Sequence, residues 1–259
     1  MREKNNRGAD KDEFEVSFQR FNNRPLTKFE FTNVMDRLKA DGFICINEKG
    51  GYHMTIHNYF WDNEMGINRK SSLRTVISHL PNIQRYCETN SFNTKSIPAY
   101  IKFETKPRKV VNQKRLDPLD FDDYNFRINY KKEIRKTAGD AIVQKLLPTW
   151  TNDSKYFRLI KRYTFIHTSM PYRVDCSVVR SSKRVGGKDV NSTTLQDSGL
   201  FDQPLTYEIE IELDNQKAFD NFDPRQDKSA VAQLKKVLMG GIMKVLSGIQ
   251  QTTYPISYP

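Results

Sequence analysis

The alternation of apolar and polar residues predicts a chain built mainly from β-strands. Segments in which every second residue is apolar recur along the sequence, and turn-forming residues separate them, as in strands with one buried face. The predicted strands cover residues 13–19, 52–57, 73–78, 97–104, 124–134, 156–167, 172–181 and 206–213. The segments 124–134 and 156–167 are long for strands, which favours a closed barrel with tall walls. The polar segment 182–204 is expected to be a mobile loop.

A different periodicity predicts a few helices around these strands. Thr27 is placed to cap a helix that continues to Leu38, because Glu30 follows it and Gly42 provides a stop. A short helix is expected at residues 81–88. Near the C-terminus, apolar residues at helical spacing predict an amphipathic helix packed on the outside of the barrel. These residues are Val231, Leu234, Leu238, Ile242, Val245, Leu246 and Ile249.

Two of the predicted strands carry carboxylates at every second position. They are Glu13 and Glu15 near the start of the chain, and Glu208, Glu210 and Glu212 near its end. Successive side chains of a strand point to opposite faces, so the glutamates share one face, whereas Ile209 and Ile211 share the other. Like charges on one face repel unless water or cations compensate them. One such strand is what any half-exposed sheet produces, but two of them suggest a divalent cation.

The strands between these two have basic faces instead. The residues that share such faces are Arg158 with Arg162, Arg173 with Asp175, and Arg127 with Lys131. A small barrel normally fills its interior with apolar side chains. The change of charge from strand to strand therefore predicts a barrel with a hydrophilic interior, in which an acidic wall faces a basic one. Carboxylates suit Mg²⁺ or Mn²⁺, and guanidinium groups suit phosphate oxygens.

The composition fits an anionic partner and a reducing compartment. Lys and Arg number 42 against 31 Asp and Glu, which gives a net charge of +11 and a pI near 9.4. Such a surplus favours nucleic acid, nucleotides or an acidic membrane face as partners and does not bear on the fold. No apolar run is long enough to cross a membrane, and the N-terminus has no segment of the signal-peptide type. Cys45, Cys87 and Cys176 are odd in number and widely spaced, so we expect reduced thiols.

The paired glutamate strands, with basic strands between them, resemble the triphosphate tunnel metalloenzymes. The Glu-x-Glu strand near the N-terminus and the Glu-x-Glu-x-Glu strand near the C-terminus are similar to the two metal-binding motifs of that family. Residues 157–165 (FRLIKRYTF) and 172–182 (YRVDCSVVRSS) resemble the RNA 5′-triphosphatases of fungal and large-DNA-virus mRNA capping enzymes, the viral branch most closely. The resemblance spans residues 12–255 and implies a β-rich α+β fold. This fold is an antiparallel closed barrel with a hydrophilic interior and a few external helices, and residues 1–11 would be a disordered lead-in.

The resemblance also implies roles for particular side chains. The metal, Mg²⁺ or Mn²⁺, would be bound directly or through water by Glu13, Glu15, Glu208, Glu210 and Glu212. The phosphate-binding residues would be Arg74, Lys102, Arg127, Arg158, Arg162 and Arg173, supported by Asp175 and Lys131. Arg74 and Lys102 are assigned from strand parity. The residues expected to be catalytic are Glu210, Glu212 and Arg162, and one of these glutamates would orient or deprotonate the water.

The central basic strand departs from the pattern of the family. Family members often alternate Arg-x-Lys-x-Arg there, whereas this chain has Ile160 and places Lys161 one position later. Either a bulge turns Lys161 into the tunnel, or one phosphate contact is missing.

The implied activity is metal-dependent removal of the γ-phosphate from the 5′-triphosphate end of nascent RNA, the first step of mRNA cap formation. Water would attack the γ-phosphorus and the β-phosphate would leave, without a covalent nucleophile. Activity on nucleoside triphosphates is expected as well. Guanylyltransferase and methyltransferase domains would lie in the same polypeptide, in the host cytoplasm or the virion. Two alternatives stay open, a phosphohydrolase of the same fold acting on tripolyphosphate, thiamine triphosphate or free nucleotides, and a non-catalytic RNA-binding domain.

Other motifs have simpler explanations. Residues 39–42, Lys-Ala-Asp-Gly, match a nucleotidyltransferase signature, but they fall at the end of a predicted helix. There the glycine ends the helix and the lysine complements its dipole. His53 and His57 lie on a predicted strand without the glutamate of a zincin, so a metal-binding pair is not expected. The basic segment 106–115 is expected to be a solvated loop that adds non-specific phosphate contacts.

Overall fold

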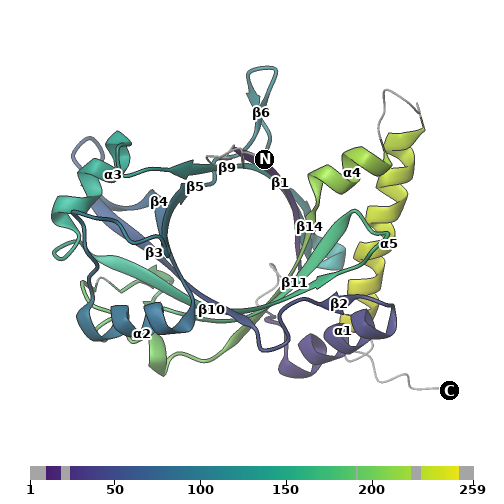
Figure 1. Cartoon of the computed structure of the whole chain (residues 1–259), viewed down its shortest axis with the longest axis horizontal. Helices are drawn as coiled ribbons and strands as arrows, with labels where there is room; N and C mark the ends of the chain where they lie inside the picture. The colour runs from purple at the N-terminus through teal and green to yellow at the C-terminus, as the bar shows by residue number, and fades with distance from the viewer. Residues whose placement is uncertain (1–9, 19–23, 191, 223–228, 251–259) are drawn as a thin grey trace, which may run out of the picture.

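A computed structural model describes residues 10–18, 24–190, 192–222 and 229–250. Its centre is a closed antiparallel barrel of eight strands, in which β1 pairs with β14 on one side and β9 on the other (Figure 1). This confirms the barrel expected from the sequence. In spatial order the strands are β1 (Lys11–Phe18), β14 (Thr206–Leu213), β11 (Tyr172–Ser181), β10 (Lys155–Ile166), β3 (Gly51–Asp62), β4 (Ile67–Ser78), β5 (Ile101–Thr105) and β9 (Phe126–Lys136).

The ends of the expected domain fall partly outside these ranges. Residues 1–9 of the expected lead-in lie outside the described part of the chain, whereas Lys11 already belongs to β1. Residues 251–255 at the other end also lie outside it.

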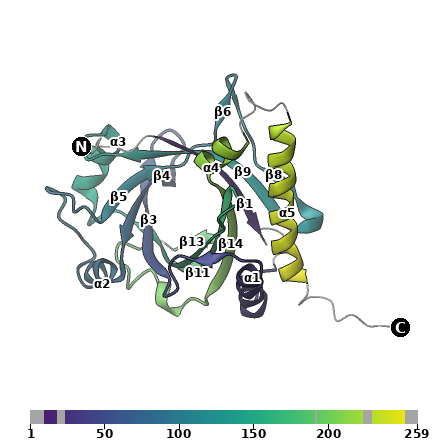
Figure 2. The same cartoon turned by 45° about the vertical axis from the view of Figure 1, so that its right-hand side comes forward.

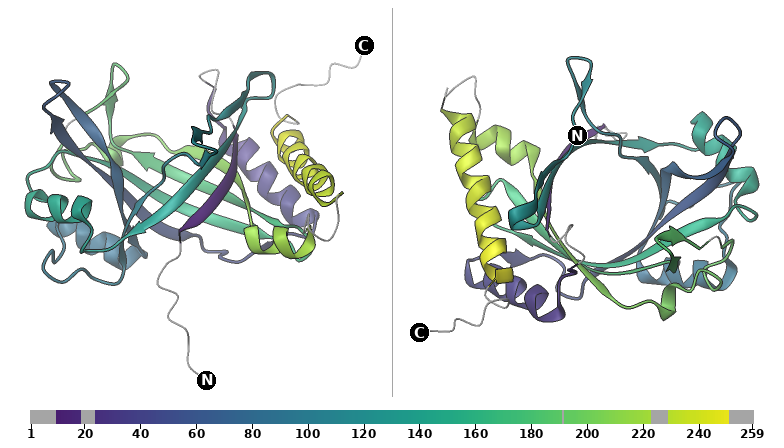
Figure 3. Two further views of the ribbon diagram at one scale, coloured as in Figure 1. Left: turned by 90° about the horizontal axis from the view of Figure 1, so that it is seen from above. Right: turned by 180° about the vertical axis from the view of Figure 1, so that it is seen from behind.

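Short strands extend the sheet or form separate hairpins. β2 (Ile44–Cys45) pairs with β10, and β8 (Leu119–Phe121) pairs with β9. The separate hairpins are β6 (Val110–Val111) with β7 (Lys114–Arg115), and β12 (Arg184–Val185) with β13 (Lys188–Asp189). These two hairpins and the β3–β4 hairpin project from the same end of the barrel (Figure 3, left). We call it the hairpin end.

Helices cover parts of the outer surface. They are α1 (Lys28–Ala40), α2 (Leu80–Thr89), α3 (Ala141–Leu146), α4 (Asn215–Asn221) and α5 (Ala230–Gln250). Short 3₁₀ turns occur at Asp122–Tyr124, Leu147–Thr149 and Leu200–Asp202. None of the helices in the described ranges is long and apolar enough to span a membrane.

Helix α1 begins at the cap expected from the sequence. The hydroxyl of Thr27 accepts from the backbone N–H of Glu30, and the Glu30 carboxylate accepts from the backbone N–H of Thr27. Arg24 lies 2.6 Å from the buried Glu30 carboxylate and balances its charge. Gly42 follows the helix with φ of +85°, a conformation that favours glycine. The local signals therefore fix both ends of α1.

Helix α5 packs against α1 and the outer face of the barrel, as predicted (Figure 2). Ile242, Val245, Leu246 and Ile249 are buried there with the outward side chains of the nearby strands. Gly248 allows the close approach of the two helices, because a Cβ at this position would lie 2.8 Å from a methyl group of Val34. This first apolar core therefore lies outside the barrel.

A second apolar core lies on the outside of the barrel, beneath α2 and α3. Trp150 and Phe157 are buried in it. The segment 182–204, expected to be mobile, contributes Leu195 and Leu200, which are also buried. This segment therefore differs from the expectation, because its two leucines anchor it to the barrel wall.

Candidate active site

The inward-pointing side chains of the barrel are mostly charged and surround a cavity of about 330 Å³, which we call the tunnel. Its acidic residues are Glu13, Glu15, Glu104, Glu133, Glu208, Glu210 and Glu212. Its basic residues are Lys11, Arg74, Lys106, Lys131, Arg158, Arg162 and Arg173. His53, Thr55, His57, Val76 and Ile160 complete the lining.

The acidic wall is built by two adjacent strands. Antiparallel pairing of β1 with β14 sets Glu15 opposite Glu212. Directly opposed residues of two strands point to the same face, so the carboxylates of both strands enter the tunnel. Glu13, Glu15 and Glu212 are each less than a tenth exposed. Five glutamates from distant parts of the sequence therefore form one surface.

The basic wall is formed by β10 and β11, next to β14. Arg158 donates to both oxygens of Glu208 at 2.6 and 2.7 Å. Arg173 lies 2.5 Å from Glu212. These ion pairs join the two walls directly.

Arg162 occupies the centre of the basic wall. Its guanidinium lies 3.4 Å from both Asp175 and Glu210, and Nε donates to Ser177. Burial alone would lower the pKa of Arg162, but Asp175 and Glu210 raise it. Asp175 is almost fully buried, accepts from Thr164 and also pairs with Arg173. The aspartate therefore holds two arginines in place.

Three lysines complete the neutralisation of the glutamates. Lys11 lies 2.7 Å from Glu212, and Lys131 lies 3.4 Å from Glu15. Lys106, which follows β5, lies 2.7 Å from Glu13. Burial and Arg74 would lower the pKa of Lys106, but Glu13 raises it.

The carboxylates fit a divalent cation in their donor chemistry. Glu13 Oε2 is buried and has no hydrogen-bond partner. Burial, together with the neighbouring Glu15 carboxylate, raises the pKa of Glu210 to about 7. An unpartnered buried oxygen and crowded carboxylates are both relieved by a hard cation with oxygen ligands.

The side chains are not gathered around one point, however. Within the described residues, no three His, Cys, Asp or Glu side chains form a ready metal cluster. The glutamates face lysines and arginines instead, and would turn from these partners to share a cation.

Comparisons with known proteins support this fold. No protein-family model matches the sequence, and a comparison with curated proteins finds no significant match. Triclinic and monoclinic structures of the Mimivirus capping enzyme triphosphatase are similar at a TM-score of 0.52. Their sequence identities are 16% and 17%, over 90% of this chain and 89% of theirs. The chain has the triphosphate tunnel fold. The S. pombe RNA triphosphatase Pct1 is similar at a TM-score of 0.49 and 11% identity, over 91% of this chain and 84% of that one.

The triphosphate tunnel contains most of the basic residues expected from the sequence, but not all. Lys102 lies opposite Val76 on the tunnel side of β5, yet it is exposed and is not part of the lining. Arg127 forms an ion pair with Asp120 of the adjacent β8, at 2.5 Å, and also lies outside the lining. Alternation along a strand thus gives the face of each residue correctly, but it does not give the position of the residue along the barrel axis.

Lys161 lies outside the tunnel. Its pairing with both neighbouring strands is continuous, without a bulge. Its ammonium lies 5.4 Å from the ring centroids of both Tyr52 and Tyr163 on the outer surface. Ile160 lines the tunnel in its place, so one basic contact of the family pattern is missing here.

The triphosphate tunnel also holds residues that sequence reasoning missed. Lys11 was placed in the lead-in, and Lys106 in a solvated loop, although both reach the acidic wall. Glu104 and Glu133 line the tunnel opposite Arg74 and Lys106, at 2.5 and 3.0 Å. Alternation along β9 already places Glu133 on the same face as Arg127 and Lys131, although no role was assigned to it, and alternation along β5 was the available signal for Glu104.

His53 and His57 face the tunnel from β3. Burial and the arginines around them lower the pKa of His53 to about 3. Burial also lowers the pKa of His57 to about 4, although its hydrogen bond to the Ser71 carbonyl opposes this. Both rings are therefore neutral near pH 7 and add hydrogen-bonding groups without charge.

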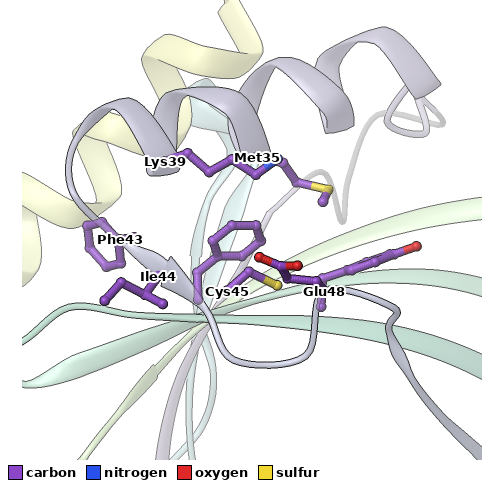
Figure 4. A pocket seen from close by; sticks show the side chains of 8 residues that line it. Met35, Lys39, Phe43, Ile44, Cys45 and Glu48 are labelled. Atoms are coloured by element: carbon purple, nitrogen blue, oxygen red, sulfur yellow. The ribbon is translucent and has the colours of Figure 1, made fainter.

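The residues of the Lys-Ala-Asp-Gly motif are not part of the tunnel lining. Lys39 borders a separate cavity of about 540 Å³ between α1 and the outer barrel wall, beside Phe43 and Cys45 (Figure 4). Asp41 forms an ion pair with Lys244 of α5 at 3.0 Å. The motif therefore serves the end of α1 and its contact with α5.

Proposed function

We propose that the protein removes the γ-phosphate from triphosphate-ended RNA with a divalent cation. The observation that carries this proposal is the enclosed tunnel in which five glutamates face Arg158, Arg162 and Arg173. A triphosphate is a compact polyanion, and rigid guanidinium groups bind its oxygens in fixed directions. The Mimivirus neighbour is a capping enzyme triphosphatase, which supports the same reaction.

The acidic wall is assigned to the metal. The residues proposed to hold Mg²⁺ or Mn²⁺ are Glu13, Glu15, Glu208, Glu210 and Glu212. When bound, the cation supplies Lewis-acid stabilisation of charge on the phosphoryl group. Either Glu210 or Glu212 orients the attacking water and accepts its proton.

The basic wall is assigned to the phosphates. Arg158, Arg162 and Arg173 bind phosphate oxygens and neutralise the charge that develops as the β-phosphate leaves. Asp175 positions two of these guanidiniums through its hydrogen bonds. Arg74 and Lys131 lie in the same lining and contribute further positive charge.

In the proposed function, binding of the cation and the triphosphate exchanges the ionic partners of the tunnel side chains. Each glutamate of the acidic wall contacts a lysine or an arginine, and Glu13 also has a second oxygen without a hydrogen-bond partner. If the glutamates held a cation, the lysines and arginines now paired with them would be free to bind phosphate oxygens, so charge would stay balanced inside a buried site. This balance matters because an uncompensated buried charge costs several kcal/mol by general estimates.

The decisive experiment measures phosphate release from three substrates. Triphosphate-ended RNA, ATP and tripolyphosphate are each incubated with Mg²⁺, with Mn²⁺ or with a chelator. We expect metal-dependent γ-phosphate release from RNA, with slower release from ATP. Chelator should abolish both, and added metal should restore them.

The alternative functions correspond to other results of this assay. A strong preference for tripolyphosphate would favour a phosphohydrolase of the same fold. Release from no substrate under any metal condition would leave a non-catalytic RNA-binding domain. If RNA is the substrate, we also propose that guanylyltransferase and methyltransferase domains act with this one in cap formation, in the cytoplasm of an infected host or in the virion.

A further inference from the structure

The β3–β4 hairpin carries a row of aromatic and basic side chains away from the tunnel. Cross-strand pairing sets Tyr59 opposite Lys70, and Trp61 opposite Asn68. The pairing register of β3 and β4 shifts between His57 and Tyr59, and beyond this shift Tyr59 and Trp61, as alternate residues, share a face. Lys70 contacts both Tyr59 and Tyr156, and Tyr156 lies opposite His57, which lines the tunnel, so this face continues the tunnel side of β3. The row therefore begins at the tunnel and continues outward along the hairpin, whose backbone projects from the end of the barrel (Figure 3, left).

Lys70 links the inner part of this row. Its Nζ lies 3.6 Å from the ring centroid of Tyr156 and 5.7 Å from that of Tyr59. The same ammonium lies 2.7 Å from the carboxylate of Asp189, on the β12–β13 hairpin. The Tyr59 hydroxyl donates to this carboxylate as well, and Arg184 pairs with it at 3.0 Å. Two hairpins thus hold the rings and the lysine in place.

The outer part of the row is open to solvent. Trp61 is 62% exposed, and Phe60 on the opposite face of the hairpin is 50% exposed beside Arg69. A cavity of about 790 Å³ lies against the hairpin, lined by these two rings, Tyr59 and Lys145 among others. That volume is within the usual range for sites that bind organic ligands.

The mouth of the tunnel opposite the hairpin end is bordered by residues of a different kind. A cavity of about 380 Å³ there is bordered by Ile46, Ile166, Asp214 and Lys217, beyond the arginines already described. Its aromatic residue, Tyr172, is buried against the helices and not offered to solvent. The two mouths therefore differ in what a chain leaving the tunnel would meet.

We propose that the row of Tyr59, Trp61, Lys70 and Tyr156 binds the first unpaired nucleotides of a single-stranded RNA whose 5′ end lies in the tunnel. The inference rests on the proposed function, and it adds the direction in which the RNA leaves. Aromatic rings stack on bases of any sequence, and interleaved cations neutralise the phosphates between them. This combination favours single-stranded nucleic acid over a protein partner.

The row can be tested without catalysis, using a short 5′-hydroxyl RNA and the two tryptophans of the chain. Trp61 is exposed, whereas Trp150 is buried. Titration with single-stranded RNA in chelator should quench the intrinsic fluorescence, and Trp61→Phe should remove the quench. Trp61→Ala should weaken binding about tenfold, as expected for the loss of one stacked base. Phe29→Ala, at a ring that is 70% exposed on α1, is the matched control and should bind as the wild type does.

The outcomes separate this inference from the proposed function. Equal affinity of the wild type and Trp61→Ala for single-stranded RNA would contradict the role of the row in RNA binding. Binding of a blunt duplex as tight as that of a single strand of the same length would contradict it as well. Tryptophan-dependent binding without phosphate release from any substrate would remove the triphosphatase function alone. With release intact, Trp61→Ala should raise the KM for triphosphate-ended RNA about tenfold relative to the KM for tripolyphosphate.

Discussion

The inner and outer faces of one barrel wall differ more than the two ends of the molecule do. On β14, Glu210 and Glu212 enter the tunnel, whereas Ile209 and Ile211, one position away, are completely buried under the helices. β10 repeats the contrast with Arg162 inside and Phe165 outside. In most small barrels the interior is the apolar core. Here the apolar cores lie outside, which leaves the interior free for chemistry.

This comparison implies that activity and stability can be changed separately on a single strand. Inward side chains contribute charge that a cation or phosphate can use, and they stabilise the fold little, because ion pairs roughly balance their own desolvation. Outward side chains remove apolar area from water and supply most of the stability.

The largest expected effect is on catalysis, from the inner face. Glu210→Ala, or Glu15→Ala, should reduce turnover by about 10³, the upper end of the range for losing a preorganised polar group from the reacting centre. Removing one of several crowded carboxylates should leave the melting temperature near the wild-type value. Phosphate release and thermal unfolding, measured on the same preparations, check both parts. Retained turnover would contradict the metal-site assignment.

The matched change on the outer face should do the opposite. Ile211→Ala removes a fully buried side chain and should lower the free energy of unfolding by about 2–5 kcal/mol. Turnover per folded molecule should stay near that of the wild type at a temperature below the melting transition. Denaturant unfolding measures the first quantity. An unchanged stability with lost activity would mean that the two faces are not independent.

A smaller catalytic loss is expected from the basic wall. Arg162→Ala should lower turnover about a hundredfold, the lower end of the range for losing a preorganised donor, because Arg158 and Arg173 remain. Lys161→Ala, one position away and outside the tunnel, is the control and should retain activity. Steady-state kinetics on both variants measure this difference. Equal rates for the two variants would reverse the assignment of the faces on β10.

The smallest expected effect is on stability and comes from Lys155, a basic side chain on the outer face of the barrel. Lys155 is fully buried, with its ammonium 5.3 Å from the ring centroid of Trp150, and this ammonium donates to two backbone carbonyls and not to a carboxylate. Burial lowers the pKa of Lys155 to about 8 from its ordinary 10.5. Between these values the unfolded chain holds the proton and the folded chain does not, so this lysine makes stability rise with pH.

Comparison with Lys155→Met isolates this contribution. The variant should gain on the order of 1 kcal/mol over the wild type at pH 7, and the gain should shrink towards pH 10. Unfolding curves at several pH values measure it. A difference that does not change with pH would show that Lys155 is not the group responsible.

Sequence reasoning was strongest where local patterns decide the structure. The bounds of β11 and β14 agree with the predicted segments, and the capping of α1 was visible in Thr27 and Glu30. Strict alternation identified the inward faces of β1, β10, β11 and β14. All of these features depend on neighbours within a few positions.

Features that depend on contacts between segments distant in the sequence were harder to predict. The depth of Lys102 and Arg127 along the axis follows from strand stagger, which no single segment encodes. Lys106 enters the acidic wall from beyond the end of β5, where periodicity stops. Leu195 and Leu200 fix the 182–204 segment although they are isolated apolar residues in a polar run. The roles assigned to the predicted site residues stay predictions until the experiments above are done.

The pairing of β1 with β14 has a consequence for how the chain folds. The ion pair between Lys11 and Glu212 joins residues 201 positions apart, so barrel closure depends on one of the longest loops the chain can form. Contacts of such separation form slowly, because the entropy of ordering the intervening chain is lost before they contribute. During synthesis β1 has no β14 partner until residues 206–213 have emerged. The acidic wall therefore cannot be complete before β14 has been synthesised, and a chain that stops before β14 has neither a closed barrel nor a complete set of glutamates.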